Sequence, residues 1–162
     1  MTRHGAAVCI NYLDASQASS VASQRAEVES VPINGRFYAA ARFGGINVFV
    51  SNAGLCQFHD FLILPKELHD RTVRINLDGA FYATKATAKM IVAQGRRGLM
   101  IGRSSGSALV GGAGKTHFAP TKARVLSLMK ELYGSVGQVR DEGQRNPPRG
   151  SAYPVERGGF ER

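Results

Sequence analysis

The sequence has no apolar run long enough to cross a bilayer. A membrane-spanning helix needs about 20 consecutive apolar residues, and the apolar stretches of this chain are much shorter. The first residues also lack the basic region and apolar stretch that mark a secretory signal peptide. We therefore expect no membrane partner and predict a cytoplasmic protein.

Cysteine is scarce as well. Only Cys9 and Cys56 occur among the 162 residues, and they do not show the Cys-x-x-Cys spacing of a zinc or redox site. In a reducing compartment two such cysteines are expected to be free thiols. The sequence thus predicts neither a metal site nor a disulfide.

Acidic residues are absent between Gly79 and Lys130, a segment that holds nine lysines and arginines. The whole chain carries a formal charge of +9, and a segment of one sign attracts anions. Its charges are spaced singly and are not gathered on a basic helix with interleaved aromatics, so we expect no nucleic-acid partner. A site for a phosphate-bearing cofactor and a solvated basic face without a function both remain open.

What is present is the pattern of a globular α/β domain. Apolar residues make up 43% of the chain and charged residues 20%. Short β-prone runs alternate with stretches of helical periodicity. The predicted strands are 6–12, 46–51 and 98–105, and the predicted helices are 14–30, 66–94 with an interruption at Gly79, and 116–133. This alternation indicates βαβ units and a parallel sheet.

The pattern ends near residue 139. Residues 140–162 contain several glycines and prolines and mix charges of both signs without periodicity. We predict one domain over residues 1–139 and a flexible tail over residues 140–162.

Three polar motifs follow the predicted elements in order. An Asn-Ala-Gly loop at 52–54 comes directly after a strand, Asn76 lies in the long helix, and Ser105 ends the next strand, with Lys122 seventeen positions later. Ligands of open α/β sheets bind at the carboxyl ends of the strands, so Asn52 and Ser105 are expected to face that crevice. Each motif also has a plain structural interpretation: Asn76 could brace a helix, Ser105 could end a strand, and Lys122 could be a solvated charge.

Together the motifs resemble those of the short-chain dehydrogenase/reductase family over residues 45–133. In that family Asn-Ala-Gly follows the fourth strand, an asparagine lies in the next helix, and a serine precedes Tyr-x-x-x-Lys by about a dozen residues. The last motif reads Phe118-Ala119-Pro120-Thr121-Lys122 in this chain. The segments 48–54 and 107–112, together with Thr116 and His117, are most similar to sugar dehydrogenases of the L-rhamnose or glucose type.

The resemblance implies an NAD(P)-dependent oxidoreductase that acts on a hydroxyl group of a sugar or polyol. It implies catalytic positions at Asn76, Ser105, Phe118 and Lys122. The family's tyrosine takes the hydroxyl proton, its lysine lowers the tyrosine pKa and holds the nicotinamide ribose, its serine orients the substrate, and its asparagine supports a water relay. A four-residue separation places positions 118 and 122 on one helical face.

The resemblance further implies contacts to the cofactor and the substrate. Cofactor contacts are expected from Asn52, Ala53, Gly54 and Lys122, and substrate contacts from Ser107 and Lys115. The cofactor is NAD or NADP, and the residues after the first strand do not decide between them. The family's Thr-Gly-x-x-x-Gly-x-Gly phosphate loop is not found in the sequence, so we expect an incomplete Rossmann-like sheet, truncated at both ends.

Two residues indicate that the expected oxidoreductase is weak or inactive. Phe118 stands at the tyrosine position, and a phenyl ring has no proton to exchange. Arg103 lies near the end of a strand that is expected to be buried, where an unpaired charge is costly. A second hypothesis is therefore a non-catalytic fragment or assembly module. Family members usually pair through the two long helices, here 66–94 and 116–133, so the chain could form a homo-oligomer.

Overall fold

The structure is a computed structural model that describes Ala7 and residues 9–11, 29–31, 40–95, 97–136 and 151–155. The chain divides into two compact units, Met1–Ile46 and Asn47–Arg162, which are described separately. Among the described helices, none combines the length and the apolar character that crossing a bilayer requires.

The first unit contains a two-stranded parallel sheet. Strand β1 (Cys9–Asn11) pairs with β2 (Glu29–Val31), and Cys9 lies opposite Glu29. The strand expected at 6–12 is thus present at its centre. The helix expected over 14–30 is wrong at its last two residues, because pairing with β1 overrides their local helical preference; residues 14–28 lie outside the described part.

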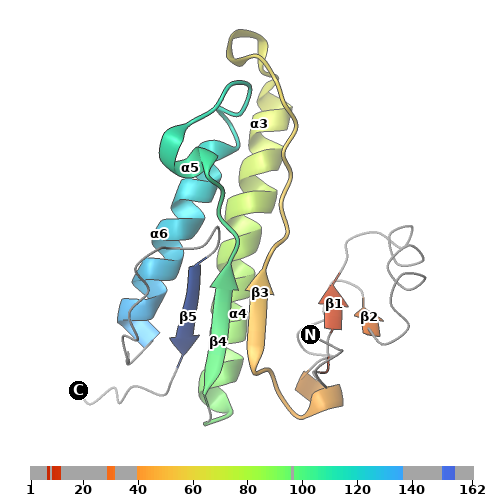
Figure 1. The fold of residues 1–162 in the computed structure, drawn as a ribbon. Helices are drawn as coiled ribbons and strands as arrows, with labels where there is room; N and C mark the ends of the chain where they lie inside the picture. Colours follow the sequence, from red (N-terminus) through yellow and green to blue (C-terminus); the bar gives the residue numbers. More distant parts are fainter. Residues whose placement is uncertain are drawn as a thin grey trace. The chain divides into compact units, whose positions relative to one another are not determined.

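The second unit contains a three-stranded sheet in the order β3-β4-β5. Strand β3 (Val48–Ser51) runs parallel to β4 (Gly98–Gly102), with Val48 opposite Leu99. Helices lie beside this sheet in Figure 1. The parallel pair with its helices confirms the predicted α/β fold.

Strand β5 (Ser151–Val155) differs from the flexible tail that we expected over residues 140–162. It pairs antiparallel with the second edge of β4, and Pro154 lies opposite Leu99. A strand edge without a neighbour offers unpaired N–H and C=O groups, and a short β-prone segment can pair with them. A proline without an N–H group is tolerated in such an edge strand. The other residues of 140–162 lie outside the described part.

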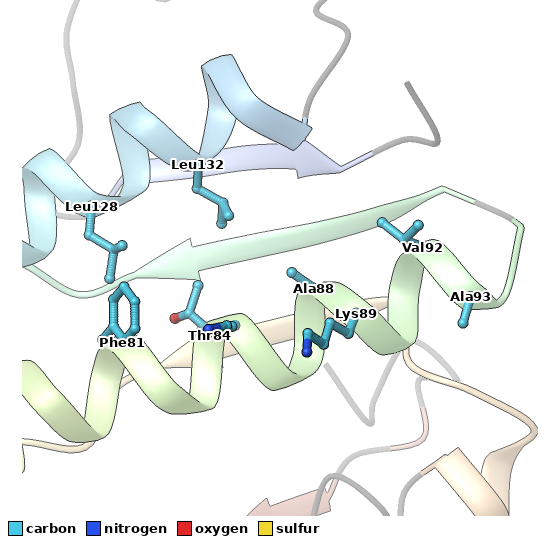
Figure 2. A pocket seen from close by; sticks show the side chains of 9 residues that line it. Phe81, Thr84, Ala88, Lys89, Val92, Ala93, Leu128 and Leu132 are labelled. Atoms are coloured by element: carbon cyan, nitrogen blue, oxygen red, sulfur yellow. The ribbon is translucent and has the colours of Figure 1, made fainter. Parts of the chain in front are cut away.

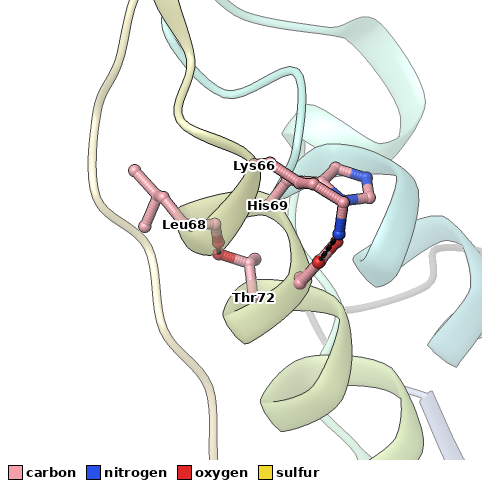
Figure 3. Close-up of polar contacts among 5 residues, drawn as sticks. Lys66, Leu68, His69 and Thr72 are labelled. Atoms are coloured by element: carbon pink, nitrogen blue, oxygen red, sulfur yellow. Dashed lines mark hydrogen bonds and ion pairs between the residues drawn. The ribbon is translucent and has the colours of Figure 1, made fainter.

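The long helical run consists of three consecutive segments: α3 (Lys66–Val73), a π-helical segment (Arg74–Asp78) and α4 (Gly79–Ala93). Lys66 pairs with Asp70 in the first turn, and the Thr72 hydroxyl donates to the carbonyl of Leu68 (Figure 3). The irregularity expected at Gly79 is therefore a π-helical turn that ends directly before it. Such turns are frequent at functional sites.

Helix α4 and helix α6 (Ala119–Val136) pack against β4. The centre of this core is formed by Ala88, Ile91 and Met100. Glycine in β4 allows the helices to approach the strand closely, because a Cβ atom at Gly98 would lie 2.5 Å from Cγ2 of Ile91. A short helix α5 (Ser107–Val110) connects β4 to α6. This packing brings the start of α6 to the carboxyl ends of β3 and β4.

Candidate functional site

The loop that follows β3 is held in place by Asn76. This side chain is fully buried in the π-helical segment. Its Oδ1 accepts the N–H of Leu55 at 2.6 Å, and its Nδ2 donates to the carbonyl of Leu55 at 2.8 Å. One amide therefore satisfies both backbone groups of a loop residue and fixes the exit from β3.

The same amide also reaches α6. Nδ2 of Asn76 donates to Oγ1 of Thr121 at 3.3 Å, and the Thr121 hydroxyl donates to the carbonyl of Phe118 at 2.7 Å. Thr121 is 2% exposed. Sequence reasoning missed this residue, although its place directly before Lys122 in the first turn of α6 was the available signal.

Lys122 brings a positive charge into the interior. Its side chain is buried, and Nζ donates to the carbonyl of Arg103 at 3.0 Å. Burial lowers the pKa of the Lys122 ammonium, the positive charge of Arg103 lowers that pKa further, and Cys56 acts in the opposite direction. Within the described residues, both ion pairs of the structure involve Asp70 and neither reaches Lys122. The hydroxyl of Ser104 donates to the Lys122 carbonyl at 2.9 Å and fixes this turn of α6 to the end of β4.

Phe118 comes directly before α6, and its ring lies beside Lys122 in the first turn of that helix. Nζ of Lys122 is 5.8 Å from the centroid of the Phe118 ring, within reach of a cation–π interaction. The ring is buried, and so is the neighbouring His117, whose two ring nitrogens have no hydrogen-bond partner among the described residues. The ring that lies beside the ammonium is a phenyl group, which has no proton to exchange.

Arg103 corrects one of our expectations. The residue is exposed, because β4 ends at Gly102 and the arginine side chain leaves the edge of the sheet. Its N–H donates to the carbonyl of Ser51 at 3.0 Å, and its Nη1 donates to Oδ1 of Asn52 at 2.9 Å. Arg103 is therefore not a buried unpaired charge.

The expected cofactor loop is exposed and lies beside these groups. Asn52, Ala53 and Gly54 are all exposed. A Cβ atom at Gly54 would lie 3.2 Å from Nζ of Lys122 and 3.4 Å from Oδ1 of Asn76, so glycine permits the close approach of the loop to both. The structure thus places the loop together with Asn76, Phe118 and Lys122.

The expected substrate contacts lie in the connection from β4 to α6. Oγ of Ser105 is 2.9 Å from Oγ of Ser107, and the Ser107 N–H also donates to Oγ of Ser105 at 3.3 Å. The ammonium of Lys115 lies 4.8 Å from the Phe58 ring centroid. A backbone hydrogen bond from His59 to the carbonyl of Gly114 joins the two loops at 3.0 Å. The structure therefore pairs the two serines with each other and places Lys115 against an aromatic ring.

Comparison with known proteins gives the arrangement a context. A family model described as "short chain dehydrogenase" matches residues 6–140. The L-rhamnose-1-dehydrogenase of Scheffersomyces stipitis is 43% identical over 155 residues, covering 85% of this chain and 60% of the relative. The L-rhamnose 1-dehydrogenase (NAD(P)(+)) of Azotobacter vinelandii is 50% identical over 99 residues, covering 61% and 39%. The chain thus spans 60% or less of the length of these relatives.

A solved structure shares the fold. The crystal structure of a short chain dehydrogenase from Bacillus anthracis superimposes with a TM-score of 0.74 at 23% identity, covering 82% of this chain and 60% of that one. At this identity the likeness concerns the fold alone. The family model, however, matches most of the chain, in the region that contains the site. The chain belongs to the short-chain dehydrogenase family.

Proposed function

We propose that the chain is an NAD(P)-binding oxidoreductase domain of the short-chain type that acts on a sugar hydroxyl, and that Phe118 makes it weak or inactive. The observation that carries the proposal is the place of the Phe118 ring at the start of α6, with the Lys122 ammonium 5.8 Å from the ring centroid. A tyrosine in place of Phe118 would have its ring beside a buried cation, which is what lowers a phenol pKa.

The sugar substrate and the cofactor are inferred from relatives. The two relatives from S. stipitis and A. vinelandii are named for L-rhamnose, and the second is also named for NAD(P)(+). A relative from Thermoplasma acidophilum, 31% identical over 94 residues, is named for NADP(+). These names support L-rhamnose as the first substrate to test and leave both nicotinamide cofactors as candidates.

The residues of the site fit the ribose side of a nicotinamide dinucleotide. The buried Lys122 ammonium makes one hydrogen bond, to the carbonyl of Arg103, and retains N–H donors for ribose hydroxyls. The exposed loop at 52–54 provides backbone groups directly beside it. The bound cofactor would supply the acceptor for the hydride.

The other polar residues would position the reactants. Ser105 and Ser107 form a pair of hydroxyls that can hold the substrate oxygen, and Asn76 holds the loop at Leu55. Phe118 lies beside Lys122 and cannot accept the substrate proton. General acid–base assistance contributes roughly 10²–10⁴-fold to a rate, so its loss would leave a severely impaired enzyme.

The experiment compares the chain with its Phe118→Tyr variant. Reduction of NAD or NADP is followed by absorbance with L-rhamnose, and cofactor binding is measured separately by NADH fluorescence. We expect the variant to gain activity by roughly 10²-fold or more, with cofactor affinity changed little. The matched control is the double variant Phe118→Tyr/Lys122→Met, which has the phenol but not the charge. The proposal is contradicted if Phe118→Tyr gains no activity and neither protein binds a cofactor.

A second candidate function is assembly, and one surface feature favours it. An apolar groove of about 490 Å³ runs between α4 and α6 (Figure 2). Its lining includes Phe81, Ala88 and Val92 from α4 and Leu128 and Leu132 from α6. Phe81 is 42% exposed. We propose that a second copy of the chain covers this groove, since exposed apolar patches mark interaction sites.

Sedimentation velocity tests the assembly. The intact chain is expected to form a dimer that Leu132→Glu converts to a monomer, because the substitution places a charge in the groove. Lys130→Glu, an exposed position of the same helix that does not line the groove, is the control. Equal sedimentation of the chain and of Leu132→Glu would rule out this interface.

A further inference from the structure

Two basic side chains flank the exposed loop that follows β3. Arg103 contacts the first residue of this loop, through the hydrogen bond from Nη1 to Oδ1 of Asn52. Lys122 approaches its third residue, since Nζ would lie 3.2 Å from a Cβ atom at Gly54. The two side chains are also joined directly, because Nζ of Lys122 donates to the carbonyl of Arg103. Three residues of exposed backbone thus lie between two cationic groups.

Neither cation is neutralised in the described part of the chain. The partner of the Arg103 guanidinium is an uncharged amide oxygen, and the partner of the Lys122 ammonium is a backbone carbonyl. Both residues lie in the segment from Gly79 to Lys130 that has no aspartate or glutamate. Burying an ammonium without a counter-ion is costly, and two neighbouring like charges repel each other. A bound anion would relieve both costs.

We propose that Arg103, Lys122 and the loop at 52–54 form a binding site for an oxyanion, the phosphate or carboxylate group of a small-molecule ligand. The guanidinium has five N–H donors in a planar fork that suits both groups, and Asn52 occupies one of them. Asn52 and Gly54 are exposed, so a ligand can reach the loop. The sequence suggested the loop at 52–54 and Lys122 as cofactor contacts, but it did not suggest Arg103, which was expected to be buried and is exposed.

Two sources can supply such a group at this edge of the sheet. One is the diphosphate of a dinucleotide, for which the sequence contains no glycine-rich phosphate loop. The other is the carboxylate of a sugar acid. The inference deepens the proposed function and rests on it for the place of the ligand, but it does not require hydride transfer.

The test is a titration of the full chain followed by calorimetry and NMR, at constant ionic strength maintained with chloride. Inorganic pyrophosphate and NAD represent the first source, and D-gluconate represents the second. We expect at least one of the three to bind, and Arg103→Gln to weaken that binding about tenfold, which is the order of one charge-assisted hydrogen bond. The control is Arg124→Gln, which removes the same charge from an exposed position on α6; two residues after Lys122, it lies about 200° away around the helix.

A second variant tests the loop. Gly54→Ala places a methyl group against Nζ of Lys122 and is expected to weaken binding of the same ligand without changing the net charge. Circular dichroism checks that each variant is folded. Competition between pyrophosphate and NAD assigns the site to the dinucleotide, and binding of gluconate alone assigns it to a sugar acid.

Two outcomes would overturn the inference: no binding of any of the three ligands, or a ligand affinity of Arg103→Gln that is no lower than that of Arg124→Gln. Its failure is distinguishable from failure of the proposed function. Pyrophosphate binding that depends on Arg103 in a chain that stays inactive after Phe118→Tyr supports the site alone. Activity of Phe118→Tyr with unchanged ligand affinity in Arg103→Gln supports the proposed function alone.

Discussion

At the scale of single residues, Asn76 connects the loop that follows β3 to α6. Its amide satisfies both backbone groups of Leu55 and also contacts Thr121 on α6. A buried amide with these contacts is a bracing group whatever else it does. The structural and the catalytic interpretations of Asn76 are therefore compatible, because fixing the loop after β3 is a condition for any chemistry at its edge.

We predict that Asn76→Ala lowers the free energy of unfolding by about 2–4 kcal/mol, since it leaves the polar groups of Leu55 without partners in a partly buried place. Urea denaturation measures the change. Asn47→Ala, an exposed asparagine of the same unit, should change it by less than about 0.5 kcal/mol. Similar effects of both substitutions would show that the contacts of Asn76 contribute little.

Lys122 predicts a pH dependence of stability. Its pKa in the folded chain lies below the ordinary 10.5, because of burial and of Arg103, with Cys56 opposing. Below the lowered pKa both states carry the charge, and the cost of burying it is fully present. As pH rises from the lowered pKa to 10.5, the folded state loses the proton first, and the free energy of unfolding rises through this window.

The measurement is denaturation from neutral pH to pH 10.5 for the chain and for Lys122→Met. The variant should be more stable at neutral pH, and the difference should shrink as pH rises. Lys130→Met, at an exposed lysine of α6, is the control and should follow the unmodified chain. A difference between chain and Lys122→Met that stays constant with pH would contradict the lowered pKa.

At the scale of elements, the close packing of β4 against two helices depends on its glycines. A Cβ atom at Gly98 would lie 2.5 Å from Cγ2 of Ile91, and one at Gly102 would lie 2.5 Å from Cγ of Met129. Ile91 and Met129 are both fully buried, so neither can move aside into solvent. The two glycines at the ends of the strand set the distance between the sheet and the helix pair.

Gly98→Ala is therefore expected to destabilise the chain by about 1–3 kcal/mol through overpacking. Gly106→Ala is the matched control, because nothing lies within 4 Å of its Cβ position. In an Ile91→Ala background the cost of Gly98→Ala should fall, since the colliding atoms are gone. An unchanged cost in that double-mutant cycle would assign the effect to the strand backbone instead.

At the scale of the whole molecule, charge opposes the assembly that the apolar groove favours. The net charge is +9, and Lys85 and Lys89 line the groove beside its apolar residues. Two copies that meet through this surface bring four of these ammonium groups together. Repulsion between exposed charges that are farther apart than the Debye length is largely screened, and this length falls to about 3 Å at about 1 M salt.

We predict that the dimer becomes tighter as salt concentration rises, measured by sedimentation between about 0.1 and 1 M sodium chloride. Lys89→Gln should weaken this dependence, because it removes one repelling charge from each copy. Lys130→Gln, an equal change of charge outside the groove, should have a smaller effect. A dimer that dissociates in high salt would contradict contact through the groove.

The sequence alone determined the α/β alternation, the family and the nearness of Phe118 and Lys122. The alternation follows from local periodicity, the family from the resemblance of its ordered motifs, and the nearness of Phe118 and Lys122 from their four-residue spacing. Only the tertiary structure decided where chain segments distant in sequence meet. Glu29–Val31 became a strand because β1 pairs with it, and Ser151–Val155 because β4 has a second edge. Arg103 is exposed and donates a hydrogen bond to Asn52 because β4 ends one residue before it. The physical reason is the same each time: pairing and burial depend on neighbours that local sequence does not specify.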